Sequence, residues 1–288
     1  MKVCFSNEGH IGDLLLNLPF IDLLIKKYPE NEYYQYNRGT VTIFDETLIR
    51  SVPGLIETNE VCGDINIFTW MCNEEYKDWV ASDDYSFVDH FTVQKFYWEK
   101  IYEKHGFDVE IPDDLGINHN FVITQESKDK IETFSTRKTG KILIFNQKTR
   151  SGQADNQDYM SYLVRMANIF PQHDFLYTNE EDIDDNLILY DNLFYTPSIF
   201  GELRCDIMQN SYISLFCDII LGRANGPFMF AAMHNSNVLN KNKLIIGQHN
   251  GNHHKDDLEI NFNRSIYKAR NIHTKTSRET FGVLESVL

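Results

Sequence analysis

The sequence has no long hydrophobic run. Its longest apolar stretches, Leu14–Leu16 and Ile219–Leu221, fall far short of the ~20 residues that a membrane-spanning helix needs. No extended apolar segment of the secretory type follows Lys2. We therefore expect a cytoplasmic protein, and peripheral contact with a membrane stays open.

Positive charge is also scarce. The 288 residues include 27 Lys and Arg against 42 Asp and Glu, which gives a net charge of -15. A surface this acidic repels phosphate backbones, so we expect no nucleic-acid partner. An anionic ligand would need a local cluster of cations or a helix N-terminus to bind.

Cysteine, proline and glycine are each limited. The five cysteines are odd in number and scattered, with no CxxC pair, which favours a reducing compartment and argues against a zinc site. Seven Pro and fifteen Gly exclude a collagenous or linker-like chain, and 42% apolar residues suffice for a core. The dinucleotide, P-loop, zinc-protease and hydrolase motifs (GxGxxG, Walker A, HExxH, GxSxG) are absent.

One histidine-rich segment could in principle hold a metal. His249, His253 and His254 precede Asp256 and Asp257. Their spacing matches no reliable metal signature, and a solvated loop explains them better. We therefore expect neither a metal nor a cofactor.

The N-terminal part begins as a strand, a glycine turn and a helix. Residues 2–6 are apolar and β-rich, and a polar turn follows at 7–13. Apolar residues then recur at helical spacing up to a stop at Pro29. Glu32–Tyr36 indicates a second strand, and this order is typical of an α/β doubly wound domain.

The same order begins again after a polar, basic, turn-forming segment at 135–140. A strand is expected at 141–146, and a strand at 217–222 runs through a turn into a helix at 228–234. We therefore predict two α/β domains, residues 1–138 and residues 139–288.

Three groups of residues could carry chemistry. In the first turn, Glu8, His10, Gly12 and Asp13 lie between a strand and a helix. A helix N-terminus there favours an anion or a developing negative charge. The simpler alternative is an ordinary helix cap at Asp13 with turn glycines.

The other two groups lie in the second half. Arg223, Asn225, Gly226 and Pro227 form a strand-to-helix turn whose backbone N–H groups suit a diphosphate. Lys148 and Arg150 follow the strand 141–146 and supply cations. A tight connection and a solvated loop are the plain alternatives.

Two segments resemble glycosyltransferase family 9, the heptosyltransferases. "SNEGHIGDLLLNLPFIDLLIKKYPE" at 6–30 is similar to the family's opening strand, Gly-Asp turn and Leu/Pro-rich helix. "CDIILGRANGPFMFAA" at 217–232 is similar to its second signature. "YWEKIYEKHGFDV" and "KILIFNQKTR" resemble the family's segments around the domain junction, in the right order.

The resemblance implies the GT-B fold, in which two Rossmann-like domains face each other across a cleft. The N-terminal domain would bind the acceptor beside Glu8, His10 and Gly12, with Asp13 at the family's catalytic-base position. The C-terminal domain would bind the nucleotide-sugar donor, with the Gly226-Pro227 turn on its phosphates. Ala224 and Met229 stand where the family usually has Asp and His, and the usual Lys after the first C-terminal strand has no clear counterpart.

The resemblance thus implies an inverting, metal-independent glycosyltransferase that acts on a glycan, lipopolysaccharide or capsule-type acceptor, glycolipids included. Two alternatives remain. One is another GT-B-like enzyme, a nucleotide-sugar epimerase or a pyruvyl transferase. The other is a non-catalytic glycan- or nucleotide-binding module with a degenerate donor site, which Ala224 and Met229 favour.

Overall fold

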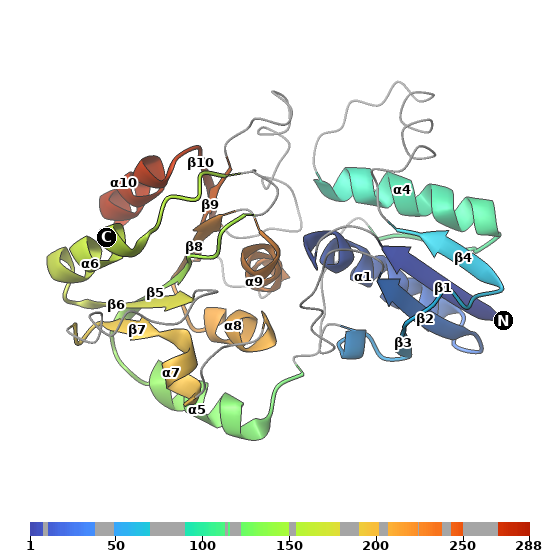
Figure 1. The fold of residues 1–288 in the computed structure, drawn as a ribbon, viewed down its shortest axis with the longest axis horizontal. Coiled ribbons are helices and arrows are strands. Elements are labelled where there is room, and N and C mark those ends of the chain that lie inside the picture. The colour runs from blue at the N-terminus through green and yellow to red at the C-terminus, as the bar shows by residue number, and fades with distance from the viewer. Residues whose placement is uncertain are drawn as a thin grey trace. The chain divides into compact units, whose positions relative to one another are not determined.

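The computed structural model describes most of the chain. The described residues are 1–7, 11–37, 49–69, 90–112, 115, 122–149, 154–178, 190–201, 207–223, 225–237, 243–249 and 270–288. They fall into two compact units, a first unit at Met1–Val122 and a second unit at Ile123–Leu258 and Tyr267–Leu288 (Figure 1). Each unit is described by itself below.

The first unit contains a parallel sheet of four described strands in the order β3-β2-β1-β4. The elements are β1 (Lys2–Asn7), α1 (Ile11–Lys27), β2 (Glu32–Asn37), β3 (Leu55–Thr58), β4 (Ile65–Phe68) and α4 (His90–His105). In a doubly wound sheet the first three strands are added toward one edge, and the fourth strand is added on the other side of the first, so the strand order reverses at that point. In this unit the reversal lies between β1 and β4.

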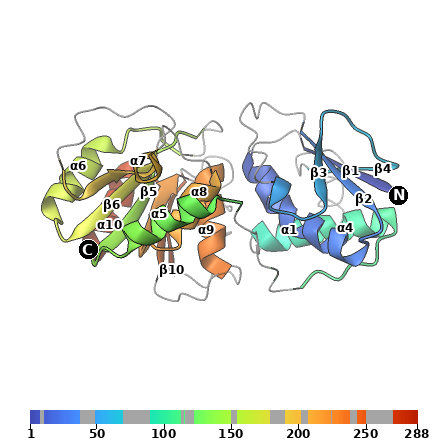
Figure 2. The same ribbon diagram turned by 90° about the horizontal axis from the view of Figure 1, so that it is seen from below.

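Alternation along β1 sorts its side chains between the two faces of the sheet. Val3 and Phe5 are fully buried, and the Phe5 ring lies 6.1 Å from the ring of Trp98 on α4. Trp98 also stacks on Phe20 of α1 at 5.6 Å. Both helices therefore pack on the same face of the sheet, as Figure 2 shows, and Cys4 points to the other.

The second unit contains a parallel sheet of six described strands in the order β10-β9-β8-β5-β6-β7. Its strands are β5 (Gly140–Phe145), β6 (His173–Thr178), β7 (Leu193–Tyr195), β8 (Ile219–Arg223), β9 (Leu244–Gln248) and β10 (Arg270–Thr274). Numbered within the unit this is the order 3-2-1-4-5-6 of dinucleotide-binding folds. The reversal lies between β5 and β8.

Helices cover both faces of this sheet (Figure 1). Ile142 and Ile144 of β5 pack with α6 (Met160–Ile169) and α10 (Ser277–Val287). Leu143 and Phe145 face the opposite way, into a core with helices on the other face. Those helices are α5 (Gln125–Ser135), α7 (Thr196–Phe200), α8 (Ile207–Ser214) and α9 (Gly226–Asn237). The continuous apolar sequence of β5 reflects this burial on both faces.

The segment that the sequence suggested as a domain linker is fixed within the second unit. Arg137 makes a bidentate pair with the buried carboxylate of Asp174, at 2.7 and 3.1 Å, and Thr139 donates to the same carboxylate. Ile131 of α5 lies in the core of the second unit. The division of contacts accordingly falls between Val122 and Ile123, ahead of the boundary expected at 138/139.

The structure contains the strands expected at 2–6, 32–36, 141–146 and 217–222 as β1, β2, β5 and β8, and the helices expected before Pro29 and at 228–234 as α1 and α9. Six elements were not expected, namely β3, β7, α7, α8, β10 and α10. Among the described helices none has the length and apolar character to cross a bilayer.

Candidate functional site

Parallel sheets place ligands outside the carboxyl ends of their strands, at the point where strand order reverses. In the second unit this point lies between β5 and β8, where Phe145 is registered with Gly222. The residues that follow each strand, Asn146–Thr149 and Asn225–Pro227, therefore meet at one edge of the sheet. These are two of the groups that the sequence singled out.

The turn from β8 into α9 is built for a close approach. A Cβ on Gly222 would lie 2.7 Å from the Phe228 ring and 2.8 Å from Cβ of Phe145, so only glycine fits between strand and helix. Asn225 caps α9, because its Oδ1 accepts from the backbone N–H of Phe228 at 3.1 Å. Its Nδ2 donates to the carbonyl of Gln147 at 3.1 Å, which ties the cap to the loop after β5.

Gly226 and Pro227 form the first turn of α9, as expected, and both are partly exposed. Proline has no N–H, and Asn225 occupies the N–H of Phe228. The free backbone donor at this helix start is therefore the N–H of Gly226, with the helix dipole behind it. Ala224 lies outside the described residues, and so does the side chain of Met229.

Arg223 has a different role from the one expected. Its side chain is fully buried, and its guanidinium donates to backbone carbonyls of the loop between β5 and α6. Nε reaches Asp155 at 2.7 Å, Nη1 reaches Asn146 at 3.1 Å, and Nη2 reaches Gln157. Arg223 thus holds the loop in place and presents no free donor face to a phosphate.

The Arg223 guanidinium also makes a cation–π contact with the ring of Tyr159, with the guanidinium carbon 3.9 Å from the ring centre. Burial raises the pKa of Tyr159 well above its usual value, so the phenol stays protonated and donates to Gln248. Burial lowers the pKa of Arg223, and the ring and carbonyls compensate part of that cost.

Asp155 fastens the same loop to the start of α10. Its carboxylate accepts from the backbone N–H of Ser277 at 3.0 Å and from the Ser277 hydroxyl. Burial alone would raise the pKa of Asp155, but hydrogen bonds from Ser277 and from the Gln157 N–H outweigh it and leave the pKa lowered. The sequence analysis missed Asp155. An acidic residue in a loop between a strand and a helix is common, so the sequence gave only a weak indication that Asp155 holds the loop.

Lys148 lies exposed in this loop. The next residue, Thr149, is fixed by Asn156, because the Thr149 N–H donates to the Asn156 side chain at 2.8 Å and the Asn156 amide donates to the Thr149 carbonyl at 3.1 Å. Lys148 is therefore carried on a fixed loop at the carboxyl end of β5, beside the cap of α9. Arg150 lies outside the described residues.

The corresponding edge of the first unit lies between β1 and β4. Asn7 ends β1 and donates to the Thr69 hydroxyl after β4 at 3.3 Å. Asn17 of α1 donates to the Thr69 carbonyl at 3.1 Å and accepts from the Trp98 indole at 2.8 Å. All four side chains are buried, so α1 and α4 are fixed to the strand ends by neutral hydrogen bonds.

The structure places the backbone of Gly12 and Asp13 in the first turn of α1, which begins at Ile11. Asp13 is thus the third residue of the helix and precedes Asn17 by one turn, on the same helix face. Glu8, His10 and the side chain of Asp13 lie outside the described part, as do His253, His254, Asp256 and Asp257. The described residues contain no group of metal-ligating side chains.

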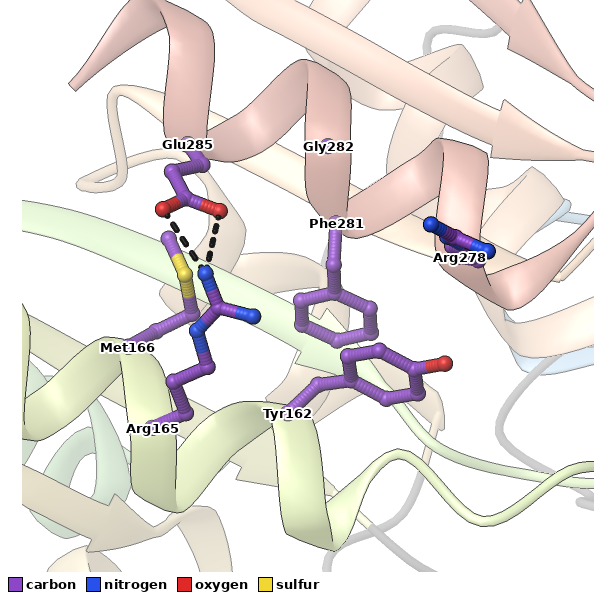
Figure 3. Close-up of a pocket in the computed structure, with 7 residues that line it drawn as sticks. All are labelled: Tyr162, Arg165, Met166, Arg278, Phe281, Gly282 and Glu285. Atoms are coloured by element: carbon purple, nitrogen blue, oxygen red, sulfur yellow. Dashed lines mark hydrogen bonds and ion pairs between the residues drawn. The ribbon is translucent and has the colours of Figure 1, made fainter.

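The second unit also has a shallow pocket of about 260 Å³ in the seam between α6 and α10 (Figure 3). Tyr162 stacks on Phe281 at 4.7 Å, and Arg165 pairs with both oxygens of Glu285 at 3.0 and 3.1 Å. The Arg165–Glu285 pair thus joins α6 to α10 at the pocket. This pocket is not at the strand ends.

No family model matches the sequence, and a search of curated proteins finds no relative. Three solved structures match almost the whole chain in fold. A glycosyl transferase family 9 protein from Veillonella parvula DSM 2008 matches with a TM-score of 0.57 at 11% identity, over 99% of this chain and 88% of that one. E. coli ADP-heptose LPS heptosyltransferase II gives 0.55 at 12% identity, over 100% and 98%.

The third structure, E. coli heptosyltransferase WaaC with ADP, gives a TM-score of 0.56 at 8% identity, over 99% of this chain and 97% of that one. Identities this low carry information on the fold alone. The predicted α/β fold with two parallel sheets is thereby confirmed. The chain has the fold of glycosyltransferase family 9 structures along nearly its full length.

Proposed function

We propose that this chain is an inverting, metal-independent glycosyltransferase that transfers a sugar from a nucleotide diphosphate to a glycan or glycolipid acceptor. The observation that carries the proposal is the pair of strand-order reversals, each followed by the turn and helix of a ligand-binding edge, in a chain with the heptosyltransferase fold along its length. The two units would face each other across a cleft, the first taking the acceptor.

The donor diphosphate would bind at the start of α9. The Gly226 N–H and the helix dipole favour an anion there, and Lys148 supplies a cation from the neighbouring loop. Arg150 would add a second. Asn225 would fix the turn, and Arg223 would act indirectly by holding the loop that carries Lys148.

Asp13 would be the catalytic base. It would take the proton of the acceptor hydroxyl as that oxygen attacks the anomeric carbon, and the bond to the leaving nucleotide diphosphate would break on the opposite side. Its place in the first turn of α1 favours the ionised carboxylate through the helix dipole. Glu8 and His10 would lie beside the acceptor.

A nucleotide panel tests the donor site first. We expect ADP, and ADP-sugars above all, to raise the thermal midpoint of the chain, because WaaC is seen with ADP and ligand binding stabilises by mass action. Lys148→Ala should weaken that binding by about tenfold and flatten its salt dependence. Exposed Lys138→Ala, in the same unit, is the matched control.

A substrate pair then tests the base. Asp13→Asn keeps the size of the side chain and removes the basic oxygen, so turnover should fall by ~10²–10⁴-fold while donor affinity hardly changes. Near-normal turnover would refute the assignment.

A non-catalytic binding module is the second candidate. It is favoured by the engagement of Arg223 with loop carbonyls, which leaves this turn without a cation of its own, and by Ala224 and Met229 in the sequence. Nucleotide binding without turnover of any donor and acceptor pair would decide for it. An epimerase or pyruvyl transferase would instead convert the donor or the glycan without sugar transfer.

A further inference from the structure

The outer face of the first sheet carries a pair of cysteines that the sequence analysis treated as scattered. Cys4 lies in the middle of β1, on the face away from α1 and α4, and is fully buried. Cys62 lies in the segment between β3 and β4 and is partly exposed. The two residues are remote in sequence, so only the fold brings them together.

The approach is made by Gly63. A Cβ on this residue would lie 2.7 Å from the backbone nitrogen of Cys4 and 2.8 Å from its Cβ. The backbone at Gly63 therefore crosses directly over Cys4, closer than any other residue type allows. Asn66 holds the crossing, since its side-chain amide bonds to both the N–H and the carbonyl of Gly63 at 3.2 and 3.1 Å.

The segment is anchored at both of its ends. The Cys62 sulfur lies 3.9 Å from the Thr58 hydroxyl at the end of β3, and the Asp64 carboxylate accepts from the backbone N–H of Lys2 at 2.8 Å. Register then pairs Cys4 with Asn66 across β1 and β4. Cys62 is thus held next to Cys4 by contacts on either side of it.

The two thiols also interact electrostatically. Burial is the largest cause of the raised pKa of the Cys4 thiol. A hydrogen bond from the backbone N–H of Cys62 lowers this pKa, whereas the charge and the hydrogen bond of the Cys62 side chain raise it. Cys4 therefore stays a protonated thiol at neutral pH. Cys62, being the partly exposed member, is the one that an oxidant in solution reaches first.

The geometry points to Cys4 and Cys62 as a redox modification site, which closes to an intramolecular disulfide with a peroxide as oxidant. Hydrogen peroxide transfers one oxygen to the Cys62 sulfur, giving a sulfenic acid and water. The Cys4 proton passes to the sulfenic hydroxyl, and Cys4 attacks the Cys62 sulfur as the thiolate. The S–S bond forms as the S–O bond breaks, and the hydroxyl leaves with that proton as a second water. A dithiol reductant reverses the step by exchange.

The bond would close a loop of about 60 residues and should stabilise the first unit. Cys4 lies within β1 and Cys62 precedes the start of β4, so the link would leave the strand ends at Asn7 and Thr69 unaltered. All three tryptophans, Trp70, Trp79 and Trp98, belong to the first unit by sequence. Tryptophan fluorescence therefore reports on the unit that the bond would change.

The test is peptide mapping of the full-length chain without reduction, after exposure to hydrogen peroxide at neutral pH. We expect a peptide pair linked through Cys4 and Cys62, removed by dithiothreitol and absent from Cys62→Ser. We also expect the fluorescence-monitored thermal midpoint to rise by roughly 10–20 °C on oxidation in the wild type, since a loop of this length is worth about 4 kcal/mol. Cys62→Ser should show no rise, and Cys217→Ala, in the second unit, should behave as the wild type.

Three results would overturn the inference. One is a stable sulfenic or sulfinic acid on Cys62 with no link to Cys4. Another is a disulfide of Cys62 with Cys72 or Cys205 instead. The third is no oxidation of either residue under conditions that oxidise a free model thiol. Cys4→Ala offers a second variant with the buried side chain removed, and should trap the sulfenic acid on Cys62.

Discussion

The two units bury polar groups of different kinds. In the described part of the first unit the buried polar side chains are neutral, namely Asn7, Asn17, Gln35, Ser51, Thr69 and Gln94. In the second unit four charged residues are buried with them, namely Lys141, Asp174, Arg223 and Lys243. The two sheets share the strand order 3-2-1-4, counted within each unit, so the difference lies in how their loops are held.

A neutral amide or hydroxyl satisfies one or two partners at modest cost, which suits the short bridges between α1, α4 and the ends of β1 and β4. A buried guanidinium costs more to desolvate but offers five donors. Arg223 uses them to hold the described residues of the loop between β5 and α6. The second unit should therefore depend more strongly than the first on individual buried charges.

The largest effect is expected for Arg223→Met. The substitution keeps an apolar stem over Tyr159 and removes the donors to the carbonyls of Asn146, Asp155 and Gln157. We expect the free energy of unfolding of the second unit to fall by about 3–5 kcal/mol. Urea unfolding followed by circular dichroism measures it.

Arg165→Met is the matched control, because Arg165 is exposed and pairs with Glu285 at the surface, where such a pair contributes about 0–1 kcal/mol. Equal losses in the two variants would mean that burial of Arg223 does not set the stability of the loop. Tryptophan fluorescence should report little change for either variant.

Lys243 should make the free energy of unfolding of the second unit change with pH in the alkaline range. Its Nζ donates to the carbonyls of Ser214 and Leu215 at the end of α8, at 2.8 and 2.6 Å, and burial lowers its pKa from 10.5 to about 8. Between these values the unfolded chain binds more protons than the folded one. Stability should therefore rise with pH in that window, by about 2 kcal/mol at pH 9.5 from this group alone.

The measurement is urea unfolding at pH 7 and pH 9.5 in the wild type and in Lys243→Met. The variant should lose the pH-dependent gain, while Lys138→Met, an exposed lysine of the same unit, should keep it. An identical gain in all three proteins would assign the pH dependence to other groups.

In the first unit Asn17→Ala should cost less and show no such dependence. The substitution leaves the Trp98 indole N–H and the Thr69 carbonyl without the Asn17 amide, at about 1–3 kcal/mol. Fluorescence-monitored unfolding should give the same loss at pH 7 and pH 9.5. Asn31→Ala, whose amide is 3.5 Å from the Tyr33 hydroxyl, is the control, and a pH-dependent loss would break the contrast between the units.

Sequence patterns predicted the parts that depend on local order. The strand, turn and helix at 2–27 and again at 219–237 follow from apolar periodicity with glycine between. β7, α7 and α8 were missed because they are only 3, 5 and 8 residues long, too short to show a clear period. The resemblance to the heptosyltransferases supplied the overall fold before any coordinates.

What the sequence could not predict depends on contacts between remote residues. The sequence suggested that Arg223 could bind a phosphate, because it does not show that the backbone carbonyls after β5 accept its hydrogen bonds. The segment around Arg137 looked like a linker because Asp174 lies far along the chain. The position of Asp174 next to the apolar Phe175 was a signal that its carboxylate would be buried and would need a cationic partner such as Arg137.

The smallest effect on stability, and the sharpest on the proposed function, is expected at Asn225. Asn225→Asp keeps an oxygen to cap α9 at Phe228 and loses the donor to Gln147, so it should cost about 1 kcal/mol or less. Its added negative charge would lie at the helix start where we place the donor diphosphate. Nucleotide affinity should therefore fall by about tenfold or more, and most strongly at low salt.

Asn225→Ala separates the two roles. It removes both hydrogen bonds without adding charge, so it should destabilise more than Asn225→Asp and yet weaken nucleotide binding less. Calorimetric titration with ADP, beside urea unfolding of each variant, measures both quantities. If the aspartate variant binds ADP as the wild type does, the diphosphate does not lie at this helix start, because a carboxylate this close to it would repel it whatever the stability of the turn.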